Sequence, residues 1–489
     1  MVNLLTRRNF VRSAAAAFGG LVLPTDAFGT GGSPLIRFGV LSDVHINDPR
    51  SDGWLEKNLR MLDGMKVDAV IFPGDLADLG YISQLRRLAA VEEKVFPNGR
   101  AADGRPVRLM HTTGNHDIGQ WPSLWKDVPP ERQRQIRFDC DDHEARVWEE
   151  IFHERWELVR RWEVNGIPFV CSQWQRAKPQ TERYFREHAR DFDPALPFVY
   201  FQHAHPKGTC HGPFGDEEGR AVDAGQATRA LAPFANAVAF SGHSHIGPTD
   251  ERAVWQGAFT SIGAGCAGIR VPSNFGSSKF HDNGGATWNG SDLLRLMPPV
   301  TTGEGVLKDN EIKGSAAMMV ELFRDHLIIH RLSCYYGRPW GEDWCVPLPA
   351  AVDGPYDFKK CAATRKAPQF AEGDKIDAAY CAKAPAWAGR EWRGKKPCVK
   401  IDFPTARRVD ISRVFDYDVT VSADGQEICR KKIISRGQHL PDCDMYPGEE
   451  VLFTVEEIPA GKEVVFTAVP FDCYGTRGRP LVSKPFSWS

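Results

Sequence analysis

Five short stretches of this 489-residue chain carry side chains that bind metals or move protons. In chain order they read SDVHIN, PGDLAD, TTGNHDIG, FQHAHP and SGHSHIG. Each stretch follows an apolar run that predicts a buried strand, and each contains or adjoins a turn marked by glycine or proline. The potential metal ligands in these stretches are Asp43, His45, Asp75, Asn115, His203, His243 and His245.

This ligand set mixes imidazole nitrogens with carboxylate and amide oxygens. Imidazole suits zinc, iron and similar ions and carboxylate suits harder ones, so the mixture indicates transition metals, with Mn, Fe and Zn all left open. Four His, two Asp and one Asn exceed what one tetrahedral ion uses, which predicts two adjacent divalent ions. A shared carboxylate can hold two ions about 3.5–4 Å apart, a spacing used for in-line phosphoryl displacement.

Strands and helices must bring these stretches together. Apolar strands are expected at 35–43, 67–75 and 105–115, with helical spacing of apolar residues at 54–65 between the first two. This alternation predicts an α/β sandwich, in which ligands gather beyond the carboxyl ends of the strands. A long helix is expected at 144–162.

The two ends of the chain read differently. From 360 to 489, short alternating strands separated by turn signals predict a smaller all-β domain, a β-sandwich whose last hairpin resembles that of a fibronectin type III-like domain. Near the N-terminus, Arg7 and Arg8 precede a short apolar run and resemble a twin-arginine export signal. Residues 1–33 are therefore expected to be a signal peptide and linker, and the protein is expected to be periplasmic or extracellular.

Composition excludes some classes of function. The formal net charge is −2, so charge alone does not indicate nucleic-acid binding. No window approaches eighteen uninterrupted apolar residues, so no membrane span is expected. Twelve cysteines without CxxC spacing predict disulfides in an exported protein, with buried free thiols as the alternative. No feature indicates a partner for the β-domain.

The ordered series D-x-H, G-D-x-x-D, G-N-H-D, H-x-x-P-like and G-H-x-H resembles the calcineurin-like metallophosphoesterase family over residues 36–345. The resemblance implies a four-layer α/β/β/α sandwich, with the domain expected at 34–350. It implies one metal held by Asp43, His45, Asp75 and His245. It implies a second metal held by Asp75, Asn115, His203 and His243, with Asp75 bridging the two.

The same resemblance assigns roles to two further residues. His116 would donate a proton to the leaving oxygen while a metal-bridging hydroxide attacks the phosphorus. Asp78 would orient His116 and support its charged form. The chain is thus expected to be a metal-dependent phosphoric ester hydrolase.

Departures from the family pattern bear on the substrate. Protein Ser/Thr phosphatases carry Arg after G-D-x-x-D and after the G-N-H motif, where this chain reads DLG and DIG. Purple acid phosphatases place Tyr where Asp78 stands and have no His at the place of His45. A monoanionic diester needs less positive charge than a monoester, which favours a phosphodiester substrate. The alternatives are a phosphomonoesterase or nucleotidase and a catalytically silent cell-surface binding protein.

Other polar residues near the motifs are expected to be structural. For His111 and His205 a structural role is favoured over a catalytic one, and Asp117 is expected to support a turn or the metal ligands from behind. His281 and Asp282 are expected in a solvated loop within the Gly-, Ser-, Asn- and Pro-rich stretch 267–312.

Overall fold

The structure is a computed structural model. It describes residues 32–118, 122–139, 143–174, 178–211, 222–268, 300–302, 305–307, 315–352, 354–385, 396–435 and 448–489. The expected export signal, most of the 267–312 stretch, His281 and Asp282 lie outside the described residues.

The first sheet has seven strands in the order β14-β13-β12-β1-β2-β3, with β15 also paired to β13. Its strands are β1 (Ile36–Val40), β2 (Ala69–Pro73), β3 (Arg108–Thr112), β12 (Ala316–Leu322), β13 (His326–Ser333), β14 (Arg338–Pro339) and β15 (Trp344–Pro347). β1, β2 and β3 are parallel, so their carboxyl ends lie at one edge of the sheet.

The second sheet has six strands in the order β4-β5-β6-β7-β9-β8. They are β4 (Val159–Val164), β5 (Ile167–Ser172), β6 (Phe198–Phe201), β7 (Ala237–Ser241), β8 (Val254–Gln256) and β9 (Thr260–Gly263). β5, β6, β7 and β9 are parallel. This sheet therefore also ends in a row of strand carboxyl termini.

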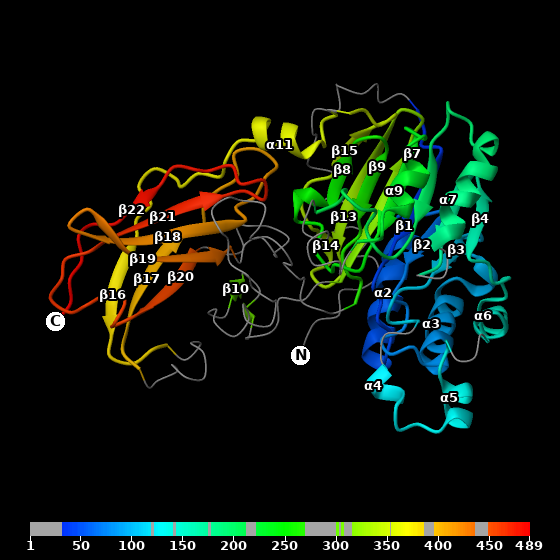
Figure 1. Cartoon of the computed structure of the whole chain (residues 1–489), viewed down its shortest axis with the longest axis horizontal. Coiled ribbons are helices and arrows are strands. Elements are labelled where there is room, and N and C mark those ends of the chain that lie inside the picture. Colours follow the sequence, from blue (N-terminus) through cyan, green and yellow to red (C-terminus); the bar gives the residue numbers. More distant parts are fainter. Residues whose placement is uncertain are drawn as a thin grey trace.

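The two sheets face each other across an apolar core that contains Phe38, Phe169 and Phe240, whose rings meet edge to face. Helices α2 (Pro49–Gly64), α3 (Ile82–Val95) and α6 (Glu144–Phe152) pack on the first sheet (Figure 1). Helices α7 (Lys178–Glu187) and α9 (Gln226–Leu231) pack on the second. The expected four-layer α/β/β/α sandwich is confirmed.

Helix α2 shows how the sequence directs one of these layers. The carboxylate of Asp48 caps the helix by accepting from the backbone N–H groups of Arg50 and Ser51, and Pro49 occupies the first turn. Leu55, Leu59 and Leu62 then recur at helical spacing and are fully buried against the sheet. The helix consequently begins directly after the SDVHIN loop and holds that loop in place.

The prediction of one long helix at 144–162 is wrong. α6 ends at Phe152 because His153 adopts a left-handed conformation, with φ of 54°. The chain then turns into β4, which pairs with β5 and buries Trp162 against Phe201. Shorter elements complete this region: η2 (Pro97–Gly99), α4 (Pro122–Trp125), α5 (Pro130–Ile136), η3 (Ala189–Asp191), η4 (Glu251–Ala253), β10 (Val300–Thr302) and β11 (Gly305–Leu307).

The C-terminal region is all-β apart from α11 (Phe358–Thr364), and its strands group together in Figure 1. One sheet has the order β16-β17-β20 and the other β19-β18-β21-β22. The strands are β16 (Asp377–Cys381), β17 (Cys398–Pro404), β18 (Asp416–Ala423), β19 (Gln426–Ile434), β20 (Gly448–Thr454), β21 (Val465–Phe471) and β22 (Leu481–Val482). Alternating residues of both sheets, among them Ile401 and Val419, form a shared core.

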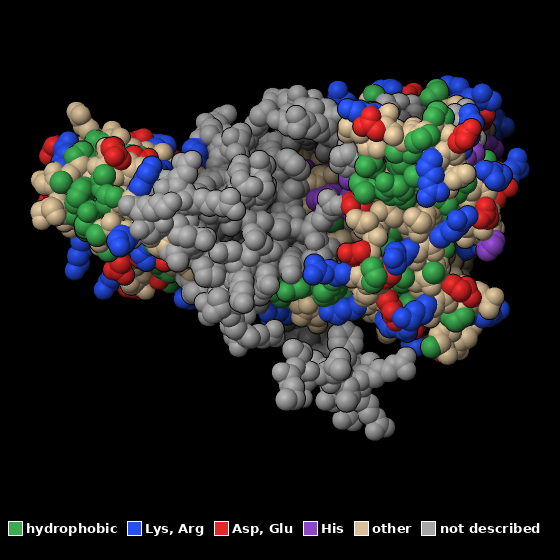
Figure 2. Space-filling model, turned by 90° about the horizontal axis from the view of Figure 1, so that it is seen from below, with side chains coloured by type: hydrophobic (Ala, Val, Ile, Leu, Met, Phe, Trp, Pro, Cys, Tyr) green, Lys and Arg blue, Asp and Glu red, His purple; other side chains and the backbone are tan. Residues whose placement is uncertain are grey.

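The surface of the described residues carries charges of both signs. Cationic and anionic side chains are interspersed over the described surface visible in Figure 2. Within the described ranges, no helix is long and apolar enough to span a bilayer.

The expected disulfides are absent among the ten described cysteines, which are all free thiols. Most of these cysteines are buried, and a buried thiol packs as a small hydrophobic group. Cys140 and Cys443 lie outside the described residues.

Candidate metal centre

The five motif stretches meet where the carboxyl ends of both sheets come together. They follow β1, β2 and β3 of the first sheet and β6 and β7 of the second. Five of the seven proposed ligands have positive φ, a conformation that L side chains rarely adopt: Asp43, His45, Asp75, His243 and His245. Such backbone strain collects at functional sites, because the surrounding structure must hold it in place. Here the backbone N–H of Asp43 donates to Gly74 O and that of His45 donates to Asp75 O, each at 3.0 Å.

One group of potential ligands comprises Asp43, His45, Asp75 and His245, whose donor atoms all lie within 4.8 Å of one another. The Nε2 atoms of His45 and His245 are 3.1 Å apart, and Nε2 of His245 lies 3.1 Å from Oδ1 of Asp43. Burial disfavours the charged carboxylate of Asp43, but the charges of His245 and His203 hold its pKa below its usual value. Buried carboxylates facing two imidazole nitrogens form a donor set that fits a divalent cation.

A second group comprises Asp75, His203 and His243, again with donor atoms within 4.8 Å. Asp75 belongs to both groups, as a bridging carboxylate must. Nδ1 of His203 donates to Pro73 O at 2.8 Å, which leaves Nε2 facing the other potential ligands. That Nε2 lies 3.1 Å from Oδ2 of Asp75 and 2.9 Å from Oδ1 of Asn115. The structure thus brings together all seven residues predicted from the sequence.

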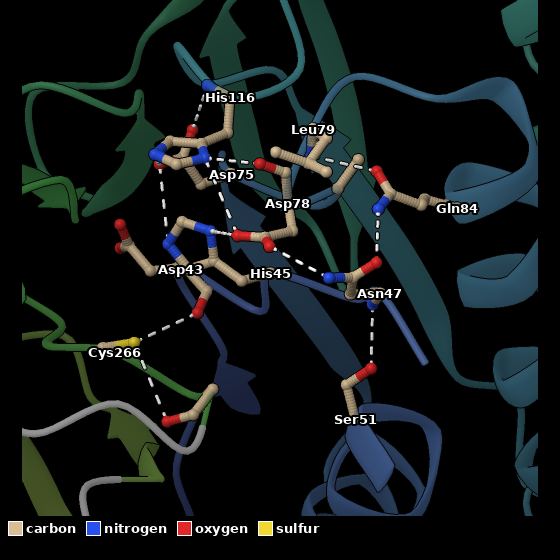
Figure 3. A network of polar contacts seen from close by, with 12 residues as sticks. Asp43, His45, Asn47, Ser51, Asp75, Asp78, Leu79, Gln84, His116 and Cys266 are labelled. Atoms are coloured by element: carbon tan, nitrogen blue, oxygen red, sulfur yellow. Dashed lines mark hydrogen bonds and ion pairs between the residues drawn. The ribbon is translucent and has the colours of Figure 1, made fainter. Parts of the chain in front are cut away.

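His116 lies beside these groups and is half-buried. Its backbone N–H donates to Oδ1 of Asp75 at 2.8 Å, and its ring centroid lies 4.5 Å from that of His45. Nδ1 of the ring donates to the backbone carbonyl of Asp78 at 2.7 Å, so Nε2 is the nitrogen available for proton transfer. Nε2 lies 3.9 Å from Oδ2 of Asp75 (Figure 3).

The Asp78 side chain lies beside two of these histidines. Its Oδ1 lies 3.3 Å from Nδ1 of His45 but 3.9 Å from Nδ1 of His116, and its Oδ2 accepts from Asn47 at 3.1 Å. The carboxylate therefore lies near the rings of both His45 and His116, and the backbone carbonyl of Asp78 also accepts from Nδ1 of His116 (Figure 3). The turn that carries Asp78 points its side chain toward the first loop, a direction that residue spacing does not reveal.

Asp117 joins two of the loops. Its buried carboxylate accepts from the backbone N–H groups of Leu76, Ala77 and Gly114 at 3.1, 2.7 and 2.8 Å. Burial and the neighbouring charge of Asp75 raise the pKa of Asp117 to about 7. A Cβ on Gly114 would lie 2.2 Å from Oδ1 of Asp75, so only glycine allows this approach. Asp117 supports the turns, as expected.

The two ambiguous histidines lie outside the groups of metal-ligand atoms formed by the described residues. His205 is fully buried, with Nδ1 2.7 Å from Ser241 Oγ and Nε2 2.9 Å from Ser244 Oγ. Burial holds the pKa of His205 well below its usual value. His111 pairs with Glu92 at 2.7 Å and stacks on Phe72, so both histidines are structural.

Three further residues at the centre were missed by sequence reasoning. The ring of Trp174 lies 5.3 Å from that of His203 and 5.2 Å from that of His243. Asn47 holds the Asp78 carboxylate, and Cys266 lies against Asp43. Asn47 ends the SDVHIN stretch, where its polar side chain could have drawn attention. Trp174 and Cys266 belong to no recognisable ligand motif: they follow strands far along the chain, and only folding brings them here.

A cavity of about 190 Å³ adjoins the centre on the side of α2. Its lining joins His45 and Asp78 to polar and aromatic residues from the start of α2, including Arg50 and Trp54, and to Gly268. A group bonded to a phosphate at the centre could extend into this space.

One family of known proteins matches the region that contains this site. Residues 36–247 match the family described as calcineurin-like phosphoesterase, a range that contains all nine residues proposed to bind metal or assist catalysis. No curated protein sequence matches the chain. This region forms a calcineurin-like metallophosphoesterase domain, and the protein is a metal-dependent phosphoesterase.

Several solved structures are similar at low sequence identity. A dimetal phosphatase from Danio rerio is 12% identical with a TM-score of 0.32, covering 64% of this chain and 99% of its own. An archaeal phosphodiesterase is 13% identical with a TM-score of 0.21, covering 47% and 85%. Vacuolar Protein Sorting 29 from Cryptosporidium parvum is 9% identical with a TM-score of 0.27, covering 64% and 97%. At such scores we draw nothing about activity from them.

Proposed function

We propose that the protein is a two-metal phosphohydrolase that cleaves a phosphodiester, with His116 protonating the leaving oxygen. The observation that carries this proposal is the position of His116 beside two groups of metal-ligand atoms that share Asp75. Two divalent ions in these groups would activate water for attack and neutralise charge on the phosphoryl group. The proposed holders are Asp43, His45, Asp75 and His245 for one ion, and Asp75, Asn115, His203 and His243 for the other.

The chain's own residues would then orient the proposed metal ligands and protonate the leaving oxygen. The Asp78 carbonyl holds Nδ1–H of His116, so a proton on Nε2 is the one this ring can deliver. Imidazole exchanges protons near neutral pH, which suits protonation of an alkoxide leaving group. The Asp78 carboxylate, whose Oδ1 lies 3.3 Å from Nδ1 of His45 and 3.9 Å from Nδ1 of His116, would help to orient both rings.

The surroundings of the carboxylates favour a diester. Asp43 and Asp75 form hydrogen bonds and ion pairs with histidines and with backbone N–H groups. Within the described ranges, neither carboxylate pairs with a Lys or an Arg. At the two places where protein phosphatases carry Arg stand Leu79 and Ile118, and Ile118 is buried. A substrate with one negative charge per phosphate needs less cationic compensation than a monoester does.

One observation supports the alternative, a phosphomonoesterase or nucleotidase. The side chain of Arg50 is exposed and lines the cavity beside His45 and Asp78. A guanidinium there could bind the extra charge of a monoester.

The test is a comparison of bis(p-nitrophenyl) phosphate with p-nitrophenyl phosphate, using protein loaded separately with Mn, Zn or Fe. We expect a higher kcat/KM for the diester, and little effect of R50A on diester turnover. A higher kcat/KM for the monoester, lost in R50A, would establish the alternative. Bound metal without turnover of either ester would instead favour a binding protein.

We also propose export through the twin-arginine pathway, on the basis of Arg7 and Arg8 and the apolar run that follows. Replacing both arginines by Lys should leave precursor in the cytoplasm, because the receptor reads the arginine pair. Cell fractionation measures this, and normal periplasmic accumulation of the variant would refute it.

A further inference from the structure

Cys266 places a sulfur atom at the first metal group. It lies three residues after the end of β9, and 3% of its surface is exposed. Its Sγ and the ring nitrogens of His45 and His245 form a set of potential ligand atoms that all lie within 4.8 Å of one another. His45 and His245 also belong to the group with Asp43 and Asp75.

Backbone hydrogen bonds fix the segment that carries this thiol. Ala267 N donates to Ser42 O at 2.7 Å, and Gly268 N donates to Asp43 O at 3.0 Å. On the other side, Ala316 N donates to Cys266 O at 2.8 Å. These bonds tie the segment to the SDVHIN loop and to β12. The thiol is therefore held rigidly against a loop that carries two of the proposed ligands.

Close packing brings the segment near that loop. A Cβ on Gly268 would lie 3.0 Å from Val44 O and 3.2 Å from Asp43 O, so a larger residue would push the segment away. The thiol of Cys266 itself contacts Asp43 O at 3.2 Å (Figure 3). A small shift of the side chain toward His45 and His245 would exchange this weak hydrogen bond for a bond to a metal ion.

We infer that Cys266 is a thiolate ligand of the metal ion held by Asp43, His45 and His245. On binding, the thiol proton leaves to solvent and the sulfur electron pair forms the bond to the ion, with no change of oxidation state. A soft sulfur donor shifts the preference of this position toward Zn²⁺, Co²⁺ and iron and away from Mn²⁺. The inference rests on the proposed metal centre and adds a ligand that the family pattern does not contain.

The test is the absorption spectrum of the full-length protein loaded with Co²⁺. A Co–thiolate bond produces an intense charge-transfer band in the near ultraviolet, whereas nitrogen and oxygen ligands produce weak visible bands alone. We expect the near-ultraviolet band in the wild type and in the matched control C334A, which removes another buried thiol that belongs to none of the described metal groups. We expect the band to disappear in C266S and C266A while the visible Co²⁺ bands remain.

The remaining outcomes separate the inference from the proposed function. A wild-type spectrum with visible Co²⁺ bands but no charge-transfer band would overturn the thiolate ligand and leave the metal centre standing. Failure of the wild type to bind Co²⁺, Zn²⁺ or Mn²⁺ would overturn the centre itself. X-ray absorption of the zinc-loaded wild type is a second measurement that needs no variant. It should show sulfur at about 2.3 Å from zinc, and a shell of nitrogen and oxygen alone would contradict the inference.

Discussion

The proposed acid can be removed without touching a proposed metal ligand. In H116N the backbone N–H that donates to Asp75 stays, and the variant loses the ring and its bond to the Asp78 carbonyl. The seven proposed ligands are unchanged, so metal content should stay at the wild-type level. A lost general acid costs about 10²–10⁴-fold in rate, equivalent to about 3–5 kcal/mol of transition-state stabilisation.

The assay compares two diesters that differ only in the leaving group. A p-nitrophenolate leaves without much protonation, so kcat should fall far less for that substrate than for a diester with an alkoxide leaving group. D78N is the comparison variant: it keeps the carbonyl that holds His116 but changes a carboxylate 3.9 Å from Nδ1 of His116 and 3.3 Å from Nδ1 of the proposed ligand His45, so its metal content is measured as well. Its kcat should fall less than that of H116N on the alkoxide substrate.

Two results would refute this reasoning. Loss of metal from folded H116N, measured by elemental analysis, would make His116 a ligand or a structural support. Full activity of H116N on the alkoxide diester would mean that another group supplies the proton. His205 is a poor substitute, since both its ring nitrogens are bonded to serine hydroxyls.

Three further predictions follow from other contacts. D75N should lower metal occupancy at both positions, and full occupancy of both in the folded variant, by elemental analysis, would show that Asp75 does not bridge. Deletion of residues 360–489 should preserve metal binding. It should lower Tm, because the ring of Phe415 covers the buried guanidinium of Arg252. An unchanged Tm in calorimetry would contradict this expectation. Burial raises the pKa of Asp416 from its ordinary value of 3.8 to about 7 in the folded protein. Between these two pH values the folded state binds a proton that the unfolded state does not. The folded protein therefore loses stability as pH rises from 3.8 to 7. D416N should therefore gain Tm relative to the wild type between pH 5 and pH 8, and a constant difference across that range would show that Asp416 does not titrate there.

The sandwich and the meeting of the motif residues could be predicted because these residues follow apolar strands directly. A run such as Ile36–Val40 must be buried, and the polar residues after it must then lie at the sheet edge. Once parallel strands align these edges, Asp43 and Asp75 come together whatever the intervening sequence. The positions of the proposed ligands therefore followed from the order of strands and turns.

Features that depend on side-chain direction could not be predicted in this way. The Asp78 carboxylate lies nearer to His45 than to His116, and the motif spacing does not reveal which of the two histidines is the nearer. The helix expected to run past Phe152 ends because His153 takes a left-handed conformation, which no strong breaker in the sequence signals. Cys266 lies at the centre because the residues after it form backbone hydrogen bonds with the SDVHIN loop. Sequence motifs do not predict such tertiary hydrogen bonds.

The central claim is that two metal ions held by these loops carry out phosphoester hydrolysis. Its most direct measurement is titration of chelator-treated, metal-free protein with Mn²⁺ or Zn²⁺ while diester turnover and bound metal are followed together. We predict no turnover without metal, and recovery that saturates when two ions are bound per chain. Full turnover by the metal-free protein, or saturation at a single bound ion, would contradict the account.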